Sequence, residues 1–211
     1  MATFLTLRAP EPRDAQPLLA HLLDDRAGRR PVGPLHGAPV VLGSQLPSNF
    51  VGVVDLDLEP RALREHRAVR YDLHPSEGEL TEALTISLSA PRVVFTTLGL
   101  QRVVDAGHGV GLREDVPADE VADFMAVLAH TDVGFVARAA DAAGVVQVLA
   151  ATVAALRGDD VRAAWEIPDV AQLRAVPDPA ARALREVLRS IEVPDAVQVV
   201  MELAGANVLR R

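Results

Sequence analysis

The segment ALTISLSAPRVVFTTLG, residues 83–99, decides which fold the sequence predicts. Leu84, Ile86 and Leu88 alternate with threonine and serine, so in a strand their side chains would share one face. A proline-bearing turn follows, and a second β-branched run extends from Val93 to Leu98. Two such arms around a turn predict a β-hairpin with one apolar face and one partly wet face.

Other segments with strand character place this hairpin in a larger sheet. In FVGVVDLDL, residues 50–58, the apolar positions face one way while Asp55 and Asp57 face the other. Short strands are also expected on both sides of the glycine-rich AGHG, residues 106–109. The remaining predicted strands cover residues 3–8, 39–42 and 69–73.

Helices are predicted mainly in the second half of the chain. Asp14 can cap a short helix near the start, and amphipathic spacing predicts helices at residues 117–131 and 178–191. Residues 133–157 fit either one alanine-rich helix or a hairpin, and residues 196–205 favour a final strand over a helix. The prediction is a single α+β domain over residues 1–211, strand-rich to 116 and helix-richer from 117. It has a twisted, mostly antiparallel sheet and three to four surrounding helices.

Composition excludes several chemistries. The 211 residues contain neither cysteine nor lysine, so all 21 basic residues are arginine. Disulfides, thiolate nucleophiles, Schiff bases and a P-loop lysine are therefore excluded. The net charge of -8 argues against a nucleic-acid partner. The chain begins without the basic and apolar regions of a signal peptide, so we expect a cytoplasmic protein.

Candidate site residues are few and lack a decisive motif. Asp55 and Asp57 could hold Mg²⁺, but the phosphatase-type motif that they resemble requires a later lysine. Asp72 and His74 share a strand face near His66, although the usual metal-binding order is H-x-D. We therefore expect no catalytic, cofactor-binding or metal-binding residues and a protein that is not an enzyme. The fallback is a dispersed polar pocket comprising Asp55, Asp57, Asp72, His74 and His108.

The glycines around His108 do not form a dinucleotide-binding loop. Gly107, Gly109 and Gly111 alternate with other residues, but no helix follows them directly, as such a loop requires. The residues that follow are extended and acidic, which would repel phosphate. We interpret this segment as a tight hairpin turn.

Three stretches resemble the bacterial gasdermins, a family of pore-forming cell-death proteins. They are VGLREDVPADEVADFMAVL (residues 110–128), GFVARAADAAGVVQVLAAT (134–152) and AVQVVMELAGANVL (196–209). The resemblance implies an autoinhibited protein of antiviral defence, which a protease activates near the C-terminus. The freed protein would self-oligomerise at a membrane, which it would reach only after activation. The implied membrane-hairpin residues are Leu84, Ile86, Leu88, Val93, Phe95, Phe135, Val146 and Val148.

Two features of the sequence bear on this resemblance. The lipidated N-terminal cysteine typical of the family is absent, because the chain contains no cysteine. Each arm of the hairpin at 83–99 is shorter than the roughly 9–11 residues that a bilayer-crossing strand needs. Two alternatives stay open: an interaction or regulatory domain of the adaptor or immunity type with a protein partner, and a small-molecule-binding protein or enzyme.

Overall fold

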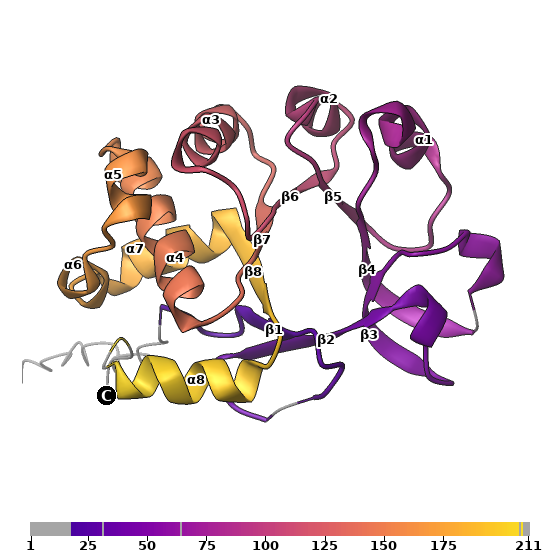
Figure 1. Cartoon of the computed structure of the whole chain (residues 1–211), viewed down its shortest axis with the longest axis horizontal. Coiled ribbons are helices and arrows are strands. Elements are labelled where there is room, and N and C mark those ends of the chain that lie inside the picture. The colour runs from indigo at the N-terminus through magenta and orange to yellow at the C-terminus, as the bar shows by residue number, and fades with distance from the viewer. Residues whose placement is uncertain (1–17, 31, 64, 207, 209–211) are drawn as a thin grey trace, which may run out of the picture.

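The computed structural model describes residues 18–206 and 208, apart from 31 and 64, and these form a closed barrel. Eight strands follow one another around the ring in chain order, and every neighbouring pair is parallel (Figure 1). The predicted antiparallel sheet is therefore wrong. The strands are β1 (Leu23–Asp25), β2 (His36–Leu42), β3 (Phe50–Asp55), β4 (His66–Leu73), β5 (Arg92–Phe95), β6 (Gly109–Leu112), β7 (Phe135–Arg138) and β8 (Leu188–Val193).

Helices lie outside the ring and join the later strands (Figure 1). In the described residues between β2, β3 and β4, the connections hold only the short 3-10 turns Gly43–Gln45 and Pro60–Ala62. The described residues form more helices than the three or four expected. They are α1 (Leu80–Thr85), α2 (Leu100–Asp105), α3 (Ala118–Leu128), α4 (Ala142–Arg157), α5 (Val161–Glu166), α6 (Val170–Arg174), α7 (Asp178–Val187) and α8 (Ala196–Gly205).

The predicted hairpin at residues 83–99 is not formed. A capping box between Ser76 and Glu79 precedes α1, which buries Leu80 and Ala83 on one face. Residues 86–91 then lead into β5, whose partners are β4 and β6. The residues proposed for the first membrane hairpin therefore lie in α1, the following loop and β5: Leu84, Ile86, Leu88, Val93 and Phe95.

The ambiguity at residues 133–157 resolves into a strand followed by a helix. Phe135 lies in β7, and the alanine-rich segment forms α4, which carries Val146 and Val148. The carboxylate of Asp141 accepts a hydrogen bond of 2.9 Å from the backbone N–H of Gly144, so it caps the helix. Gly144, which favours a hairpin in isolation, is thus accommodated in the first turn of α4.

The expected final strand at residues 196–205 is helix α8. Asp195 caps it by accepting a hydrogen bond of 3.0 Å from the backbone N–H of Gln198. Its buried residues Ala196, Val199 and Leu203 follow a helical spacing of three and four residues. The prediction of a strand was wrong because an alternating pattern in so apolar a segment does not distinguish the two states.

The other local predictions divide between correct and wrong. A strand is confirmed in the segments 39–42, 50–58 and 69–73, and a helix in 117–131 and 178–187. The helix expected to continue to Ile191 is wrong beyond residue 187, because residues 188–193 form β8. The strand expected before AGHG and the hairpin turn expected at AGHG are wrong, because residues 100–105 form α2 and the following β6 pairs in parallel with β5 and β7. The strand expected at residues 3–8 and the cap at Asp14 lie outside the described residues. Of the helices in the described part of the chain, none is long and apolar enough to span a bilayer.

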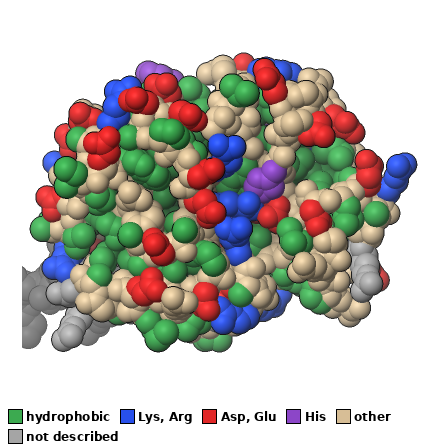
Figure 2. All heavy atoms as spheres, viewed as in Figure 1, with side chains coloured by type: hydrophobic (Ala, Val, Ile, Leu, Met, Phe, Trp, Pro, Cys, Tyr) green, Lys and Arg blue, Asp and Glu red, His purple; other side chains and the backbone are tan. Residues whose placement is uncertain are grey.

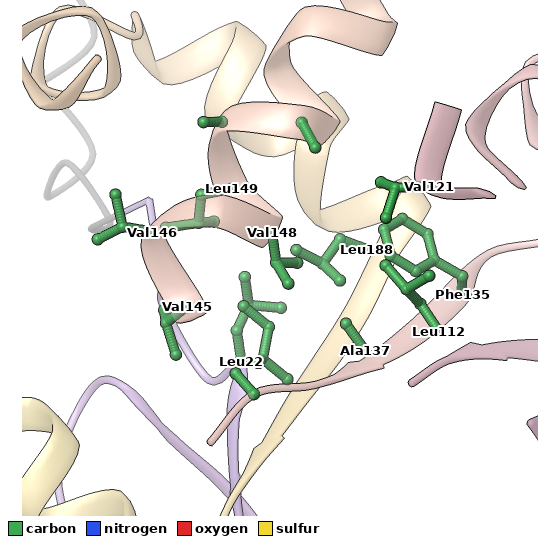
Figure 3. Close-up of a cluster of buried hydrophobic side chains, with 14 of the residues drawn as sticks. Leu22, Leu112, Val121, Phe135, Ala137, Val145, Val146, Val148, Leu149 and Leu188 are labelled. Carbon is green, nitrogen blue, oxygen red and sulfur yellow. The ribbon is translucent and has the colours of Figure 1, made fainter. Parts of the chain in front are cut away.

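The hydrophobic core lies between the outer face of the strands and the helices. Val148 of α4 points toward Leu188 of β8 in the close-up, near Phe135 and Ala137 of β7 (Figure 3). These side chains are almost completely buried. Burial of this apolar layer stabilises the barrel from its outer face. The side chains inside the ring can therefore be polar or charged, unlike the branched apolar side chains that usually fill such barrels.

Candidate functional site

The interior of the barrel contains a buried ionic network. Barrels of this architecture are usually filled with branched apolar side chains. Here Asp24, Asp72 and Glu192 are at most 2% exposed, and the guanidinium of Arg70 lies among them. A buried guanidinium requires carboxylate partners, because an isolated charge in a protein interior is strongly destabilising.

Arg70 is fully engaged by these partners. Its Nη1 donates to Asp24 Oδ2 at 2.9 Å and to Ser190 Oγ at 2.8 Å. Its Nε donates to Asp72 Oδ1 at 2.9 Å, and its Nη2 donates to Glu192 Oε1 at 2.5 Å. Arg70 therefore connects β4 to β1 and β8 across the interior of the barrel.

A second arginine extends the network toward the carboxyl ends of the strands. Arg138 Nε donates to Glu192 Oε2 at 2.8 Å, and Arg138 Nη2 donates to Asp55 Oδ2 at 2.7 Å. The other oxygen of Asp55 lies 3.0 Å from His74 Nε2. The side chain of His74 is 33% exposed, compared with 13% for Arg138, so the network emerges at His74.

Phe95 supports both the His74 ring and the Arg138 guanidinium at this end of the barrel. The His74 ring stacks on the Phe95 ring at a centroid distance of 4.7 Å and an interplanar angle of 22°. The guanidinium carbon of Arg138 lies 4.6 Å from the same ring centroid. Phe95 is itself 2% exposed, so it forms the buried floor on which His74 rests.

Strand register explains why these residues meet. Asp55 is paired with Asp72 between β3 and β4, and Arg138 is paired with Glu192 between β7 and β8. Parallel strands in register direct such neighbours to the same side of the sheet. Asp55 and Arg138 end their strands and His74 follows β4, so all three lie at the carboxyl ends, where active sites of such barrels are found. Basic, acidic and histidine side chains gather at the centre of the ring in the space-filling view (Figure 2).

Burial and pairing divide the carboxyl groups of the network into two kinds. Burial raises the pKa of Asp72 well above its ordinary value, and Glu192 adds to this rise while Arg70 opposes it. Burial would also raise the pKa of Glu192, but its hydrogen bond with Asp72 and the charges of Arg70 and Arg138 lower it. Asp72 is therefore the more readily protonated member of this pair, and Glu192 is the more readily ionised one.

Asp55 belongs to the ionised kind. Its partial burial raises the pKa, but the hydrogen bond with His74 and the charge of Arg138 outweigh that effect and lower the pKa below its ordinary value. An ionised Asp55 accepts hydrogen bonds on both oxygens, one from each neighbour. Asp55 thus fixes the position of His74 relative to Arg138.

The structure brings together part of the polar pocket considered from sequence. Asp55, Asp72 and His74 lie in the network, whereas Asp57 accepts a hydrogen bond of 2.8 Å from the backbone N–H of Ser44 outside the barrel. His108 is also separate, with its Nε2 3.1 Å from the carbonyl oxygen of Leu84.

Several members of the site were missed from sequence, namely Asp24, Arg70, Phe95, Arg138 and Glu192. One signal could have found most of them. The charged residues lie between apolar or aromatic residues inside short strands, as in AVRYDL, FVAR and SIEV. A charge in such a strand is a candidate for an interior position when both faces of the strand are buried.

The acidic and histidine side chains of the network are the residues that could bind a metal ion. Among the described residues, no group of three or more histidine or acidic side chains is arranged to hold a metal ion. The nearby His66 instead has its Nε2 2.7 Å from the hydroxyl of Tyr71. Inside the barrel, guanidinium groups occupy the space between the carboxylates.

A cavity of about 380 Å³ adjoins His74 at the carboxyl ends of β3 and β4. Its walls are apolar and polar in nearly equal measure: Leu56, Leu73 and Ile86 are among the apolar lining residues, and Glu59, Glu79 and Glu82 contribute carboxylates. This volume lies within the range of small-molecule sites. His74 is thus both the end of the buried network and part of a cavity wall.

Comparisons with known proteins give no relative from which a role could be transferred. The chain matches no protein-family model, no curated protein and no solved structure.

Proposed function

We propose that the protein binds a small molecule at the carboxyl end of the barrel and that His74 exchanges a proton with it. The observation that carries this proposal is the pairing of His74 Nε2 with Asp55 Oδ1 at 3.0 Å beside the cavity. A carboxylate that orients a partly exposed imidazole is a common arrangement for general acid–base chemistry.

The hydrogen-bonding pattern gives the two imidazole nitrogens different roles. We assign the Nε2 proton to the hydrogen bond with Asp55, because Asp55 is an ionised acceptor. Nδ1 then carries a lone pair, and within the described residues it has no hydrogen-bond partner. The Nδ1 atom is therefore the position at which a bound molecule would give up or receive a proton.

The rest of the site supports this role by holding His74 still. Asp55 is held from its other side by Arg138, which Glu192 holds in turn, and the ring of Phe95 supports the imidazole. A catalytic group must stay close to its productive geometry, and such surrounding contacts provide that restraint. The architecture adds an argument by analogy, because barrels of this kind place their active sites at this end.

The other hypotheses from sequence remain untested predictions. The two hairpins on which the pore-forming hypothesis depends are absent from the described structure, so no contact described above supports it. No surface feature among the described residues identifies a protein partner for the adaptor or immunity-type alternative. The ionic network and the cavity favour the small-molecule hypothesis over both.

The proposal is tested with an activated ester, p-nitrophenyl acetate, which reports an accessible histidine acting as a base or nucleophile. The purified protein should release p-nitrophenol at least about tenfold faster than His74→Gln at pH 7.5. His108→Gln is the matched control, because His108 lies outside the network, and it should retain the wild-type rate. Equal rates for the wild type and His74→Gln, with both proteins folded, would refute the proposed role.

A further inference from the structure

A second cavity, of about 330 Å³, opens at the carboxyl ends of β5 and β6. The loop after β5, the end of β6 and helix α3 form its walls. Apolar side chains dominate the lining, including Leu98, Leu112, Phe124 and Val127. Leu98 is 55% exposed, so a large apolar side chain faces solvent at this cavity.

The polar groups of this cavity are mostly at neutral or acidic residues. Thr96 and Thr97 contribute hydroxyls, and Glu120 and Asp123 contribute carboxylates. The single arginine in the lining, Arg113, already pairs with Asp115 at 3.5 Å. These groups favour a neutral apolar occupant over an anion.

Phe95 forms the link between this cavity and His74. Thr96, a lining residue, directly follows Phe95, and Gly111 both lines the cavity and lies against the Phe95 ring. A methyl group built on Gly111 would lie 2.3 Å from Phe95 Cγ, which shows how closely the ring approaches the backbone there. The same ring stacks on His74 at 4.7 Å. One aromatic ring thus contacts both the cavity wall and the proposed acid–base residue.

We infer that this second cavity receives the apolar part of the molecule whose polar part reaches His74. The inference rests on the proposed function of His74 and specifies the ligand as an amphipathic small molecule with a neutral alkyl or aromatic group. The volume lies in the range of ligand sites, and a bound apolar group would cover Leu98. Both sites lie at the same end of the barrel, and the Phe95 ring lies between them, against Gly111 of the second cavity and against His74.

The test uses the neutral fluorescent probe N-phenyl-1-naphthylamine with the full-length protein. Val127→Trp fills the cavity from α3 and should weaken probe binding by about tenfold or more. Ala126→Trp adds the same side chain at the neighbouring exposed position of α3 and should bind the probe like the wild type. Leu98→Glu places a charge at a solvent-exposed position of the lining and should also weaken binding, which keeps the test decisive if Val127→Trp fails to fold.

The connection to His74 needs its own measurement. Binding of the probe should shift the imidazole Cε1–H proton resonance of His74 in the NMR spectrum, because Phe95 contacts both sites. Probe binding that Leu98→Glu and Val127→Trp both leave unchanged would overturn the cavity assignment. An unmoved His74 resonance would overturn the shared-ligand inference, while slower ester cleavage by His74→Gln would still support the proposed function. If the wild type and His74→Gln instead cleave the ester at equal rates while probe binding still shifts the His74 resonance, the proposed function fails and the cavity assignment stands.

Discussion

Gly111→Ala should displace Phe95 and thereby disturb His74. A Cβ atom at Gly111 would lie 2.3, 2.4 and 2.6 Å from three carbon atoms of the Phe95 ring. Favourable carbon–carbon contacts begin at about 3.5 Å, so the ring must retreat by roughly 1 Å. Overpacking of this kind destabilises a folded protein by about 1–3 kcal/mol. The ring cannot move in this way and keep its stacking on His74, whose centroid distance is 4.7 Å.

Two measurements separate the local effect of Gly111→Ala from a general loss of stability. Urea unfolding gives the change in stability, and the His74 Cε1–H resonance reports ring stacking, because an aromatic ring shields protons above its face. Gly109→Ala is the matched control: it lies on the same strand, and its added methyl would meet Val93 Cγ2 at 2.9 Å rather than Phe95. Both variants should lose stability, but only Gly111→Ala should shift the His74 resonance downfield. An unchanged resonance in Gly111→Ala, or an equal shift in Gly109→Ala, would refute this reasoning.

Three further substitutions test the network and the fold. Arg70→Met leaves buried carboxylates without their partner and should lower the free energy of unfolding, measured in urea, by about 3–5 kcal/mol. The control Arg67→Met, at an exposed position of the same strand, should change the free energy of unfolding little. Burial raises the pKa of Asp72, so the stabilisation from its protonated carboxyl is fully present below its ordinary pKa of 3.8 and is lost as the pH rises through the raised pKa. The stability of Asp72→Asn relative to the wild type should therefore increase with pH. A difference in stability that does not change with pH would contradict the raised pKa. Asp141→Ala removes the α4 cap and should lower the free energy of unfolding by about 1 kcal/mol; no loss would contradict capping.

Local patterns in the sequence predicted individual elements better than their pairing. The acidic first turn and apolar face of residues 117–131 predicted α3, and the β-branched run at residues 50–58 predicted β3. The antiparallel strand pairing predicted at residues 83–99 was wrong, because the segment before Arg92 has the pattern of a hairpin arm, whereas residues 80–85 form a helix. That helix changes a hairpin return into a crossover, and a crossover produces parallel strands.

The site was harder to predict than the elements, because its contacts are remote in sequence. Arg70 is 46 residues from Asp24 and 122 residues from Glu192. Asp72 and His74 could be selected because they lie close together in the sequence, but nothing local connects either of them to Arg138. Only the closed ring, which places β8 beside both β1 and β7, brings these charges together.

The central claim is that Asp55 and His74 act as one unit at the carboxyl end of the barrel. A double-mutant cycle on the cleavage of p-nitrophenyl acetate tests it most directly, using wild type, Asp55→Asn, His74→Gln and the double variant. Residues that act as a unit give strongly non-additive effects. The double variant should therefore cleave the ester at the rate of His74→Gln alone. If the two losses instead multiply, Asp55 and His74 act independently and the account is contradicted.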